Sequence, residues 1–472
     1  MEYEITIGLE THVMQKTKTK MFCGCLNKYN STPNTNVCFV CLGYPGALPV
    51  INKKAVELCC KAGLLLGCKI NKYSKWDRKN YFYPDMSKNY QITQNDYPLC
   101  SNGSVETEVN GKLKKFFIER IHQEENAAKN THDGKASNVD YNRAGTALME
   151  IVTEPCMHSA DEALAYMTLI KQILQYGNIS DCDQEKGQMR SDVNISVRPK
   201  GHEKLGAKVE IKNMNSFSFI VDAINYESQR QIDILSSGGV VEQQTRGYDS
   251  SRGETFLQRT KEDAHDYRYF PEPDLLPLNI TDEQINTWSL ELPELPSSRQ
   301  QRYISMGLPD YDAKLLTNNI LISDWFDDVL QYTKNIKTAS NFIMSDIMRL
   351  ISETSINVSE SELHAIDFAT IVDYVDSQKI SVNSGRQLIE IIFIEGGSPE
   401  EIINQKEMIQ VSDDSSLISW IDEAIQNNPK PVQEYKDGNP SSINFIMGQV
   451  MKISKGKANP STVMEILKNK LS

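Results

Sequence analysis

The fold of this chain is decided close to its amino terminus, by the stretch Tyr3-Glu4-Ile5-Thr6-Ile7-Gly8-Leu9-Glu10-Thr11-His12-Val13. Apolar and polar residues alternate along it, so that Ile7 and Leu9 face one way while Glu10 and His12 face the other. Such alternation is typical of a β-strand with one buried and one solvated face. The sequence therefore predicts a strand that carries a carboxylate and an imidazole on its polar side.

Similar patterns farther along the chain indicate a mixed α/β domain. Residues 188–197 and 208–212 alternate in the same way and predict two more strands. Residues 159–177 and 217–235 have helical periodicity instead, and Ser159 and Glu162 have the spacing of a capping box. This mixture of strands and helices extends over about the first 290 residues.

The remainder of the chain is predicted to be helical. Two prolines in residues 292–296 indicate a linker, and residues 316–332 and 361–376 beyond it have helical periodicity. The stretch 396–399 is a candidate hinge, and residues 428–431, which include two prolines, are expected to form a loop. We therefore expect three domains, 1–294, 295–400 and 401–472, of which the first is α/β and the other two are all-helical.

Composition limits the class of protein. No apolar run reaches the roughly 18 residues that a membrane span needs, and the first residues lack the layout of a signal peptide, so we expect a cytoplasmic protein without a membrane partner. The net charge of −13 argues against a general nucleic-acid coat, because phosphate binding needs Lys and Arg.

The end of the chain has the opposite charge. Residues 427–472 carry seven lysines and three acids, a local charge of +4, and Lys452, Lys455 and Lys457 lie within six residues. These three lysines are the expected contacts to RNA, although a basic tail fits a solvated helix end equally well.

A nucleotide would have to be bound through carboxylates and a metal ion. The chain has neither a G-x-x-x-x-G-K-[ST] loop nor a G-x-G-x-x-G turn after a strand. Acidic residues on strand-like segments offer the alternative, and they are Glu10, Glu124, Glu125, Glu150, Asp192 and Glu210. Mg²⁺ prefers one or two carboxylates together with phosphate oxygens and water. An ordinary solvated face is the competing interpretation, since periodicity does not reveal which strands are neighbours.

The cysteines give a sharper local signal. Cys23 and Cys25 are separated by 12 residues from Cys38 and Cys41. Two close pairs around a short loop match a tetrahedral four-thiolate zinc site, and such a closed site would stabilise the fold without performing chemistry. The alternative is four unliganded thiols in a reducing cytoplasm.

Two segments, 77–85 and 266–274, mix aromatic and charged residues. Such segments can stack bases and hold phosphates, as the single-stranded end of an RNA requires. By composition alone they fit ordinary loops at the edge of a core equally well.

A series of short motifs runs in order along essentially the whole chain. They are Ile7-Gly8-Leu9-Glu10-Thr11-His12-Val13, Pro45-Gly46-Ala47-Leu48-Pro49-Val50, residues 78–85, Asn142-Arg143-Ala144-Gly145-Thr146-Ala147-Leu148-Met149-Glu150-Ile151-Val152-Thr153-Glu154-Pro155, Arg190-Ser191-Asp192-Val193-Asn194, Glu210-Ile211-Lys212-Asn213, residues 266–274, and Lys455-Gly456-Lys457-Ala458-Asn459-Pro460. Together they resemble the B-subunit family of the aspartyl/glutamyl-tRNA(Asn/Gln) amidotransferases.

The resemblance implies a cradle-type α/β catalytic domain with a kinase site and a zinc loop, then a helical domain and a tRNA-binding tail domain. It implies that ATP and Mg²⁺ are held by Glu10, His12, Glu124, Glu125, Glu150, Asp192 and Glu210, with Glu10, His12, Glu125 and Glu150 as the magnesium ligands. In the family, ATP phosphorylates the side-chain carboxylate of Glu or Asp on tRNA, and ammonia then displaces the phosphate. This chemistry needs ATP, a metal and a water-poor site.

The resemblance also implies partners. No amidase-type Ser/Lys arrangement is found, so ammonia is expected from a separate glutaminase (amidase) A-subunit, joined through a small C-subunit in a heterotrimer. The chain would then belong to a glutamine-hydrolysing carbon–nitrogen ligase that is active only as a complex.

Two rival interpretations remain. An archaeal-type subunit specific for Glu-tRNA(Gln) would carry a large inserted domain where this chain has a short linker. A zinc-stabilised tRNA-binding module without chemistry would leave the carboxylates unexplained.

Overall fold

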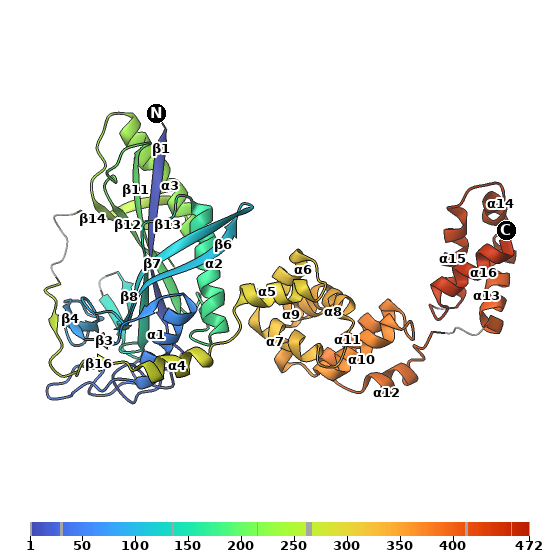
Figure 1. Ribbon diagram of the computed structural model, residues 1–472, viewed down its shortest axis with the longest axis horizontal. Helices are drawn as coiled ribbons and strands as arrows, with labels where there is room; N and C mark the ends of the chain where they lie inside the picture. Colours follow the sequence, from blue (N-terminus) through green and yellow to red (C-terminus); the bar gives the residue numbers. More distant parts are fainter. Residues whose placement is uncertain are drawn as a thin grey trace. The chain divides into compact units, whose positions relative to one another are not determined.

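The computed structural model describes residues 2–28, 32–134, 136–214, 216–260, 267–410, 414–454 and 456–471. The chain divides into two compact units, Met1–Leu295 and Pro296–Ser472, whose elements are labelled in Figure 1. The first unit is a mixed sheet with helices and the second is helical, which confirms the predicted fold class. Within the described residues, no helix is both long and apolar enough to cross a membrane.

A nine-stranded sheet forms the centre of the first unit, with the strand order β14-β13-β12-β11-β1-β10-β7-β6-β2. Its strands are β1 (Tyr3–Met14), β2 (Lys69–Ile70), β6 (Cys100–Val109), β7 (Lys112–Glu125), β10 (Ala147–Thr153), β11 (Met189–Pro199), β12 (Val209–Met214), β13 (Gln244–Asp249) and β14 (Glu254–Thr260). Neighbours are antiparallel except β12 and β13, which are parallel. The amino-terminal strand therefore lies in the middle of the sheet, between β10 and β11.

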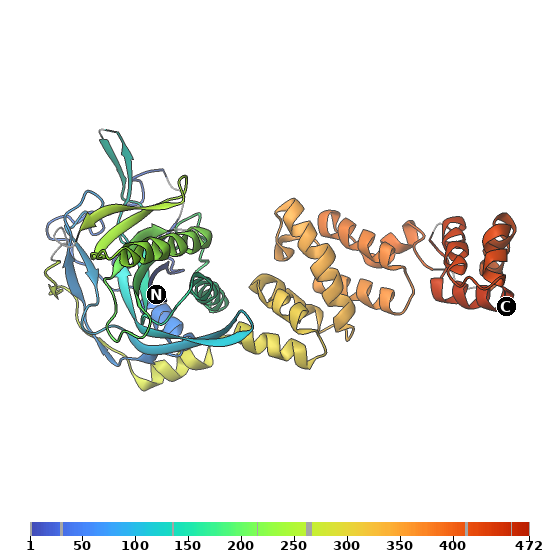
Figure 2. The same ribbon diagram turned by 90° about the horizontal axis from the view of Figure 1, so that it is seen from above.

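Three helices pack against one face of this sheet, and Figure 2 shows the sheet curving around them. They are α1 (Lys53–Leu65), α2 (Ala160–Tyr176) and α3 (Phe217–Ser236). Ile7, Leu9 and Val13 of β1 are fully buried in the core that these helices share with the sheet. The alternation predicted for β1 is confirmed, because Glu10 and His12 lie on the face away from that core.

Local signals set the limits of α2. The Ser159 side chain accepts a hydrogen bond from the Glu162 backbone N–H, as the capping spacing predicts. In a capping box the Glu162 carboxylate would accept a hydrogen bond from the backbone N–H of Ser159 itself. Here it accepts one from the N–H of His158, the residue before the cap.

Three small sheets complete the first unit together with α4 (Asp282–Leu290). The first sheet has three strands in the order β15 (Phe270–Pro271), β4 (Asp77–Asn80) and β5 (Tyr90–Thr93). The second pairs β16 (Leu278–Asn279) with β3 (Tyr73–Ser74), and the third pairs β8 (Lys129–Asp133) with β9 (Ala136–Asp140). The first of these brings the two aromatic and charged segments together, since Arg78 pairs with Phe270 in the ladder and binds the Glu272 carboxylate at 2.7 Å.

The second unit contains helices α5 (Pro296–Ser305), α6 (Asp310–Thr317), α7 (Ile320–Val329), α8 (Ile336–Phe342), α9 (Met348–Thr354), α10 (Ala365–Asp376), α11 (Val382–Glu395), α12 (Pro399–Gln405), α13 (Asp414–Asn427), α14 (Pro429–Lys436), α15 (Ser442–Ile453) and α16 (Pro460–Leu471). A π-helical turn at Ile343–Ile347 and a 3-10 turn at Val358–Glu360 lie between some of them. One hydrophobic cluster runs from Tyr303 to Ile403 and a second from Leu417 to Leu471.

One sequence expectation in this unit is wrong. The expected loop at 428–431 is the start of α14, since Pro429 stands in the first helical turn, where a missing N–H costs nothing. The helical periodicity of residues 316–332 is distributed over two helices, the end of α6 and the whole of α7, because the Asn319 side chain accepts a hydrogen bond from the Leu321 N–H and caps α7.

Candidate functional site

A row of side chains crosses the polar face of the sheet. Strand pairing puts Glu150 of β10 opposite both His12 of β1 and His122 of β7. Nε2 of His12 lies 3.6 Å from the Glu150 carboxylate and 3.8 Å from that of Glu124, while Nε2 of His122 lies 3.1 and 3.5 Å from the same two groups. One ligand atom each from His12, Glu124 and Glu150 lies within 4.8 Å of the others, as a bound cation requires.

The electrostatics of this first cluster also fit a cation. Burial lowers the pKa of His122, but Glu150 and Glu124 outweigh it and raise that pKa to about 9. Burial opposes ionisation of Glu124, yet the hydrogen bond from His122 holds its pKa at about 2. The two buried carboxylates are therefore ionised and need positive charge nearby. Nδ1 of both histidines is buried without a hydrogen-bond partner among the described residues.

A second acidic cluster lies on the same face. Glu10 of β1 is directly opposite Asp192 of β11, and Glu210 of β12 completes a set whose ligand atoms lie within 4.8 Å of one another. Asn194 donates a hydrogen bond of 2.8 Å to the Glu10 carboxylate and orients it. Burial raises the pKa of Glu10, and the negative charges of Glu150 and Glu210 raise it further.

Lysines partly offset that charge. Lys212 lies 2.6 Å from Glu210 and 3.3 Å from Asp192. Burial opposes its charge, but the two carboxylates raise the pKa of Lys212, so it stays an ammonium. Lys79 is held charged in the same way, because Glu124 and Glu150 outweigh the effect of burial on its pKa. On such a face the carboxylates can bind divalent cations, and the lysines can bind the phosphate groups that those cations accompany.

Glu125 points elsewhere. Its carboxylate binds Lys88 and accepts a hydrogen bond of 2.9 Å from the Ile92 backbone N–H. Neither of the two acidic clusters includes it, so its expected role as a magnesium ligand stays a prediction. His122 is the residue that sequence reasoning missed, although its position two residues before Glu124 places both on one face of a strand.

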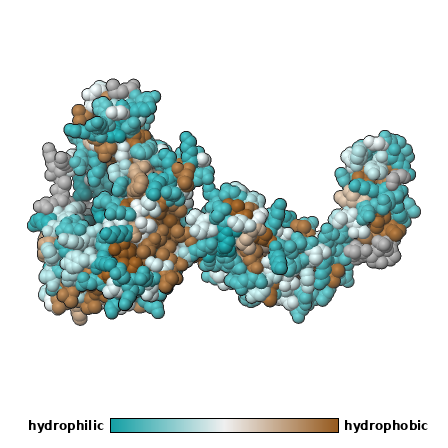
Figure 3. All heavy atoms as spheres, in the orientation of Figure 1, coloured by the Kyte–Doolittle hydropathy of each residue, from teal (hydrophilic) through white to brown (hydrophobic). Residues whose placement is uncertain are grey.

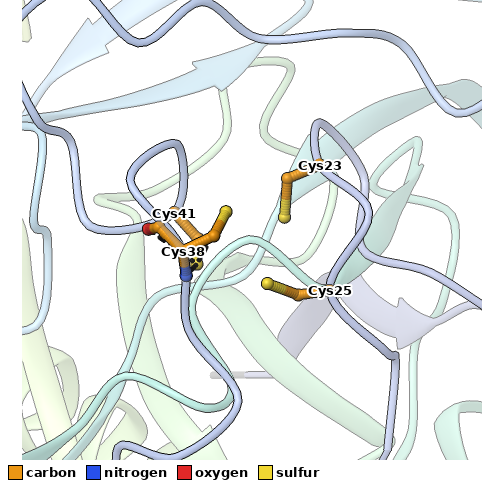
Figure 4. A group of neighbouring side chains, drawn as sticks. All are labelled: Cys23, Cys25, Cys38 and Cys41. Carbon is orange, nitrogen blue, oxygen red and sulfur yellow. Dashed lines mark hydrogen bonds between the residues drawn. The ribbon is translucent and has the colours of Figure 1, made fainter.

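The four cysteines converge in a loop between β1 and α1, where Figure 4 shows all four side chains directed toward a common centre. Their sulfur atoms lie within 4.8 Å of one another, and the Cys41 sulfur accepts a hydrogen bond of 3.1 Å from the Cys38 N–H. The hydrogen bond with Cys23 lowers the pKa of Cys41 to about 4, whereas burial raises that of Cys25 to about 11. Four soft ligands in this arrangement fit a tetrahedral zinc ion.

The expected tRNA-contacting lysines differ in their surroundings. Lys452 is exposed in the last turn of α15. Lys457 forms an ion pair of 2.6 Å with Glu407. Lys455 lies outside the described residues.

Fold and site together define the class of this chain: an α/β unit with two acidic clusters on its sheet that could hold cations, continued by a helical unit. Residues 5–286 match the family model of the GatB/GatE catalytic domain, and residues 324–471 match that of the GatB domain. The chain therefore belongs to the B-subunit family of the aspartyl/glutamyl-tRNA(Asn/Gln) amidotransferases, as the motifs predict.

Curated relatives support this assignment over the full length. The amidotransferase B-subunits of Caldicellulosiruptor saccharolyticus and Persephonella marina are 48% and 47% identical to this chain, and the alignments cover 100% of the chain and 99% and 100% of the relatives. That of Clostridium novyi is 44% identical, with both chains covered completely.

Proposed function

We propose that this chain is the tRNA-binding and phosphorylating subunit of a cytoplasmic glutamine-dependent amidotransferase. It activates the side-chain carboxylate of Glu on tRNA(Gln) and of Asp on tRNA(Asn), and the activated groups become amides. The observation that carries this proposal is the pair of acidic clusters on one face of the sheet, with ligand atoms within 4.8 Å in each. The curated relatives, named as B-subunits of aspartyl/glutamyl-tRNA(Asn/Gln) amidotransferase, support the choice of substrate.

The reaction has two steps. A carboxylate oxygen of the aminoacyl side chain forms a bond to the γ-phosphorus of ATP, and the bond from that phosphorus to the β-phosphate oxygen breaks, which releases ADP. Ammonia then attacks the carbonyl carbon, loses a proton, and inorganic phosphate leaves. Phosphate is a far better leaving group than a carboxylate oxygen, which is why ATP is needed.

Residues of this chain have distinct roles in those steps. His12, Glu124 and Glu150 would hold one Mg²⁺, and Glu10, Asp192 and Glu210 a second. When bound, such ions neutralise the charge on the transferring phosphoryl group. Asn194 orients Glu10, and Lys79 supplies a fixed positive charge beside the first cluster.

The other parts of the molecule have supporting roles in this proposal. A structural zinc ion on Cys23, Cys25, Cys38 and Cys41 stabilises the loop after β1, and a tail domain at 401–472, beyond a helical domain at 295–400, grips tRNA. Ammonia comes from a separate glutaminase (amidase) A-subunit, joined with a small C-subunit in a heterotrimer. Figure 3 shows hydrophobic surface around α1 and α2, and Leu164 of α2 is 37% exposed, which fits a surface that a partner covers.

The rival interpretations have less support. A zinc-stabilised RNA-binding module without chemistry would leave two cation-binding clusters without a role. The archaeal-type subunit would require a large insertion, whereas the relatives named as B-subunits align along the whole of this chain.

Replacement of Glu150 by Gln tests the kinase site. It keeps the volume and removes the charge that faces both histidines, so tRNA-dependent ATP cleavage by the assembled complex should fall by on the order of 100-fold or more. Glutamine hydrolysis by the partner should persist at its basal rate. Glu119→Gln is the matched control, since Glu119 lies on β7 with a 54% exposed side chain. ATP cleavage at the wild-type rate in Glu150→Gln would contradict the assignment.

A further inference from the structure

Arg190 extends the row of functional side chains by one strand. It is the β11 residue directly opposite His12, and it lies on the polar face with Asp192, two residues farther along the same strand. Directly opposed residues in antiparallel strands have Cα atoms about 4.5–5.5 Å apart. Arg190 therefore lies next to one member of each acidic cluster, His12 across the strand pair and Asp192 along its own strand.

This half-buried arginine has no hydrogen bond or ion pair within the described part of the chain. Two acidic residues of the clusters are engaged elsewhere, since Glu150 faces the two histidines and Lys212 binds Asp192. A guanidinium presents several N–H donors in a planar fork that matches a carboxylate or a phosphate. A half-buried guanidinium group whose N–H donors have no acceptor is suited to bind a ligand that supplies a carboxylate or phosphate oxygen.

The surroundings of Arg190 strengthen this inference. Arg143 lies within electrostatic range of it and is anchored by bonds from Nε to the Ala127 carbonyl oxygen and from a terminal nitrogen to that of Ala128, at 3.0 and 2.8 Å. Burial, followed by the repulsion from Arg190, lowers the pKa of Arg143 to about 10. Asp85 is also near, but it makes no ion pair with either arginine within the described residues. Two guanidinium groups that repel each other favour an anion between or beside them.

We propose that Arg190 binds the side-chain carboxylate of the aminoacyl group and so distinguishes the charged substrate from its neutral amide product. This inference rests on the proposed function and adds a specificity-determining residue to it. The carboxylate is the group that must approach the phosphate held at the two clusters, and Arg190 is a cation beside both of them that makes no ion pair within the described residues. The amide has no negative charge, so it loses the charge-assisted bond.

The test is a comparison of two forms of one tRNA. The assembled complex is titrated with Glu-tRNA(Gln) and with Gln-tRNA(Gln), so that contacts to the tRNA body cancel. Wild-type protein should bind the Glu form more tightly, by roughly 10- to 100-fold, the range of one charge-assisted bond. Arg190→Gln should bind both forms equally, and Arg190→Lys should retain part of the difference, because it keeps the charge without the fork.

Arg198→Gln is the matched control. Arg198 lies on the same strand and the same face, but it is bonded to Glu4 at 3.1 Å and to the Glu203 carbonyl at 3.0 Å, away from the acidic clusters. It should leave the discrimination unchanged. Far-ultraviolet circular dichroism and zinc content of each variant establish that it is folded.

The outcomes are separable. If Arg190→Gln still prefers the Glu form by the wild-type factor, the inference is overturned. If instead affinity for ATP falls while that preference stays, Arg190 serves the nucleotide phosphates and the carboxylate assignment is wrong. If wild-type complex shows no tRNA-dependent ATP cleavage at all, the proposed function fails, and that result does not depend on any Arg190 variant.

Discussion

At the scale of a single residue, Lys20 shows how a buried charge connects two parts of the catalytic unit. Its side chain is fully buried, and Nζ lies 3.0 Å from the Asn36 carbonyl oxygen, 3.4 Å from that of Tyr141, and 3.7 Å from the Cys41 sulfur. An isolated buried ammonium is costly, so its retention here requires compensating negative charge. A zinc ion on four thiolates carries a net charge of −2, which Lys20 would partly neutralise.

Replacement of Lys20 by Met should therefore weaken zinc binding. The expected loss is about 10-fold or more in affinity, as is usual when a group that contacts a metal ligand is removed, with about 3 kcal/mol lost from the free energy of unfolding. Chelator competition and urea denaturation measure the two quantities. Lys18→Met is the control, because Lys18 is exposed two residues earlier. Wild-type zinc affinity in Lys20→Met would mean that the ammonium serves the backbone carbonyls only.

At the scale of elements, the cysteine loop is fastened to the strand that carries Glu150. The Met21 N–H donates to the Gly145 carbonyl at 2.7 Å, and the Gln15 N–H donates to that of Ala147 at 3.0 Å. Ala147 is the first residue of β10. Gly145 has a φ of +76°, which favours glycine, and it brings the turn before β10 close to Cys41. We therefore expect a change in the loop to affect β10, the strand that carries Glu150.

Cys38→Ser should consequently lower zinc content, stability and catalysis together. Wild-type protein should contain about one zinc per chain, and the variant should contain much less and melt several degrees lower, because structural zinc contributes directly to the free energy of folding. Elemental analysis and calorimetry measure these effects. Cys156→Ser serves as the control, since Cys156 is outside the cluster. A zinc-free wild type that melts at the same temperature would refute the structural role.

At the scale of the whole molecule, charge and chemistry are divided between the two units. The acidic clusters belong to the unit Met1–Leu295, whereas the basic tail belongs to Pro296–Ser472. The tail has a hydrophobic cluster of its own, from Leu417 to Leu471. Binding of the tRNA body and activation of its aminoacyl group are therefore expected to respond to different mutations.

Replacement of Lys452, Lys455 and Lys457 by Ala should weaken tRNA binding without changing turnover at saturating tRNA. Each lost phosphate contact flattens the slope of log K against log salt by about 0.7–0.9. Lys457 is already paired with Glu407, so the change in the salt slope should be smaller than the change expected for three lysines without ion pairs. Titration at several salt concentrations measures it, with exposed Lys53, Lys54 and Lys112 replaced in the control. Unchanged affinity and slope would locate the RNA contact elsewhere.

Much of this arrangement is contained in the sequence because it depends on local spacing. Alternation alone assigns Glu10, His12, Asp192 and Glu210 to polar strand faces, and two close cysteine pairs around a short loop are enough to predict a tetrathiol cluster. Proline and glycine positions indicate where helical structure replaces the sheet. These inferences hold because each concerns residues within a few positions of one another.

The tertiary structure decided which of those residues meet. β1 pairs with β10 and β11, from which it is separated by more than 130 residues, and that register sorts the carboxylates into two clusters, brings His122 into the first, and leaves Glu125 with Lys88. It also places Arg190 beside His12. Strand periodicity assigns a residue to a face, but only hydrogen bonding between strands sets its neighbours across the sheet, and that pairing is selected by burial of the whole core.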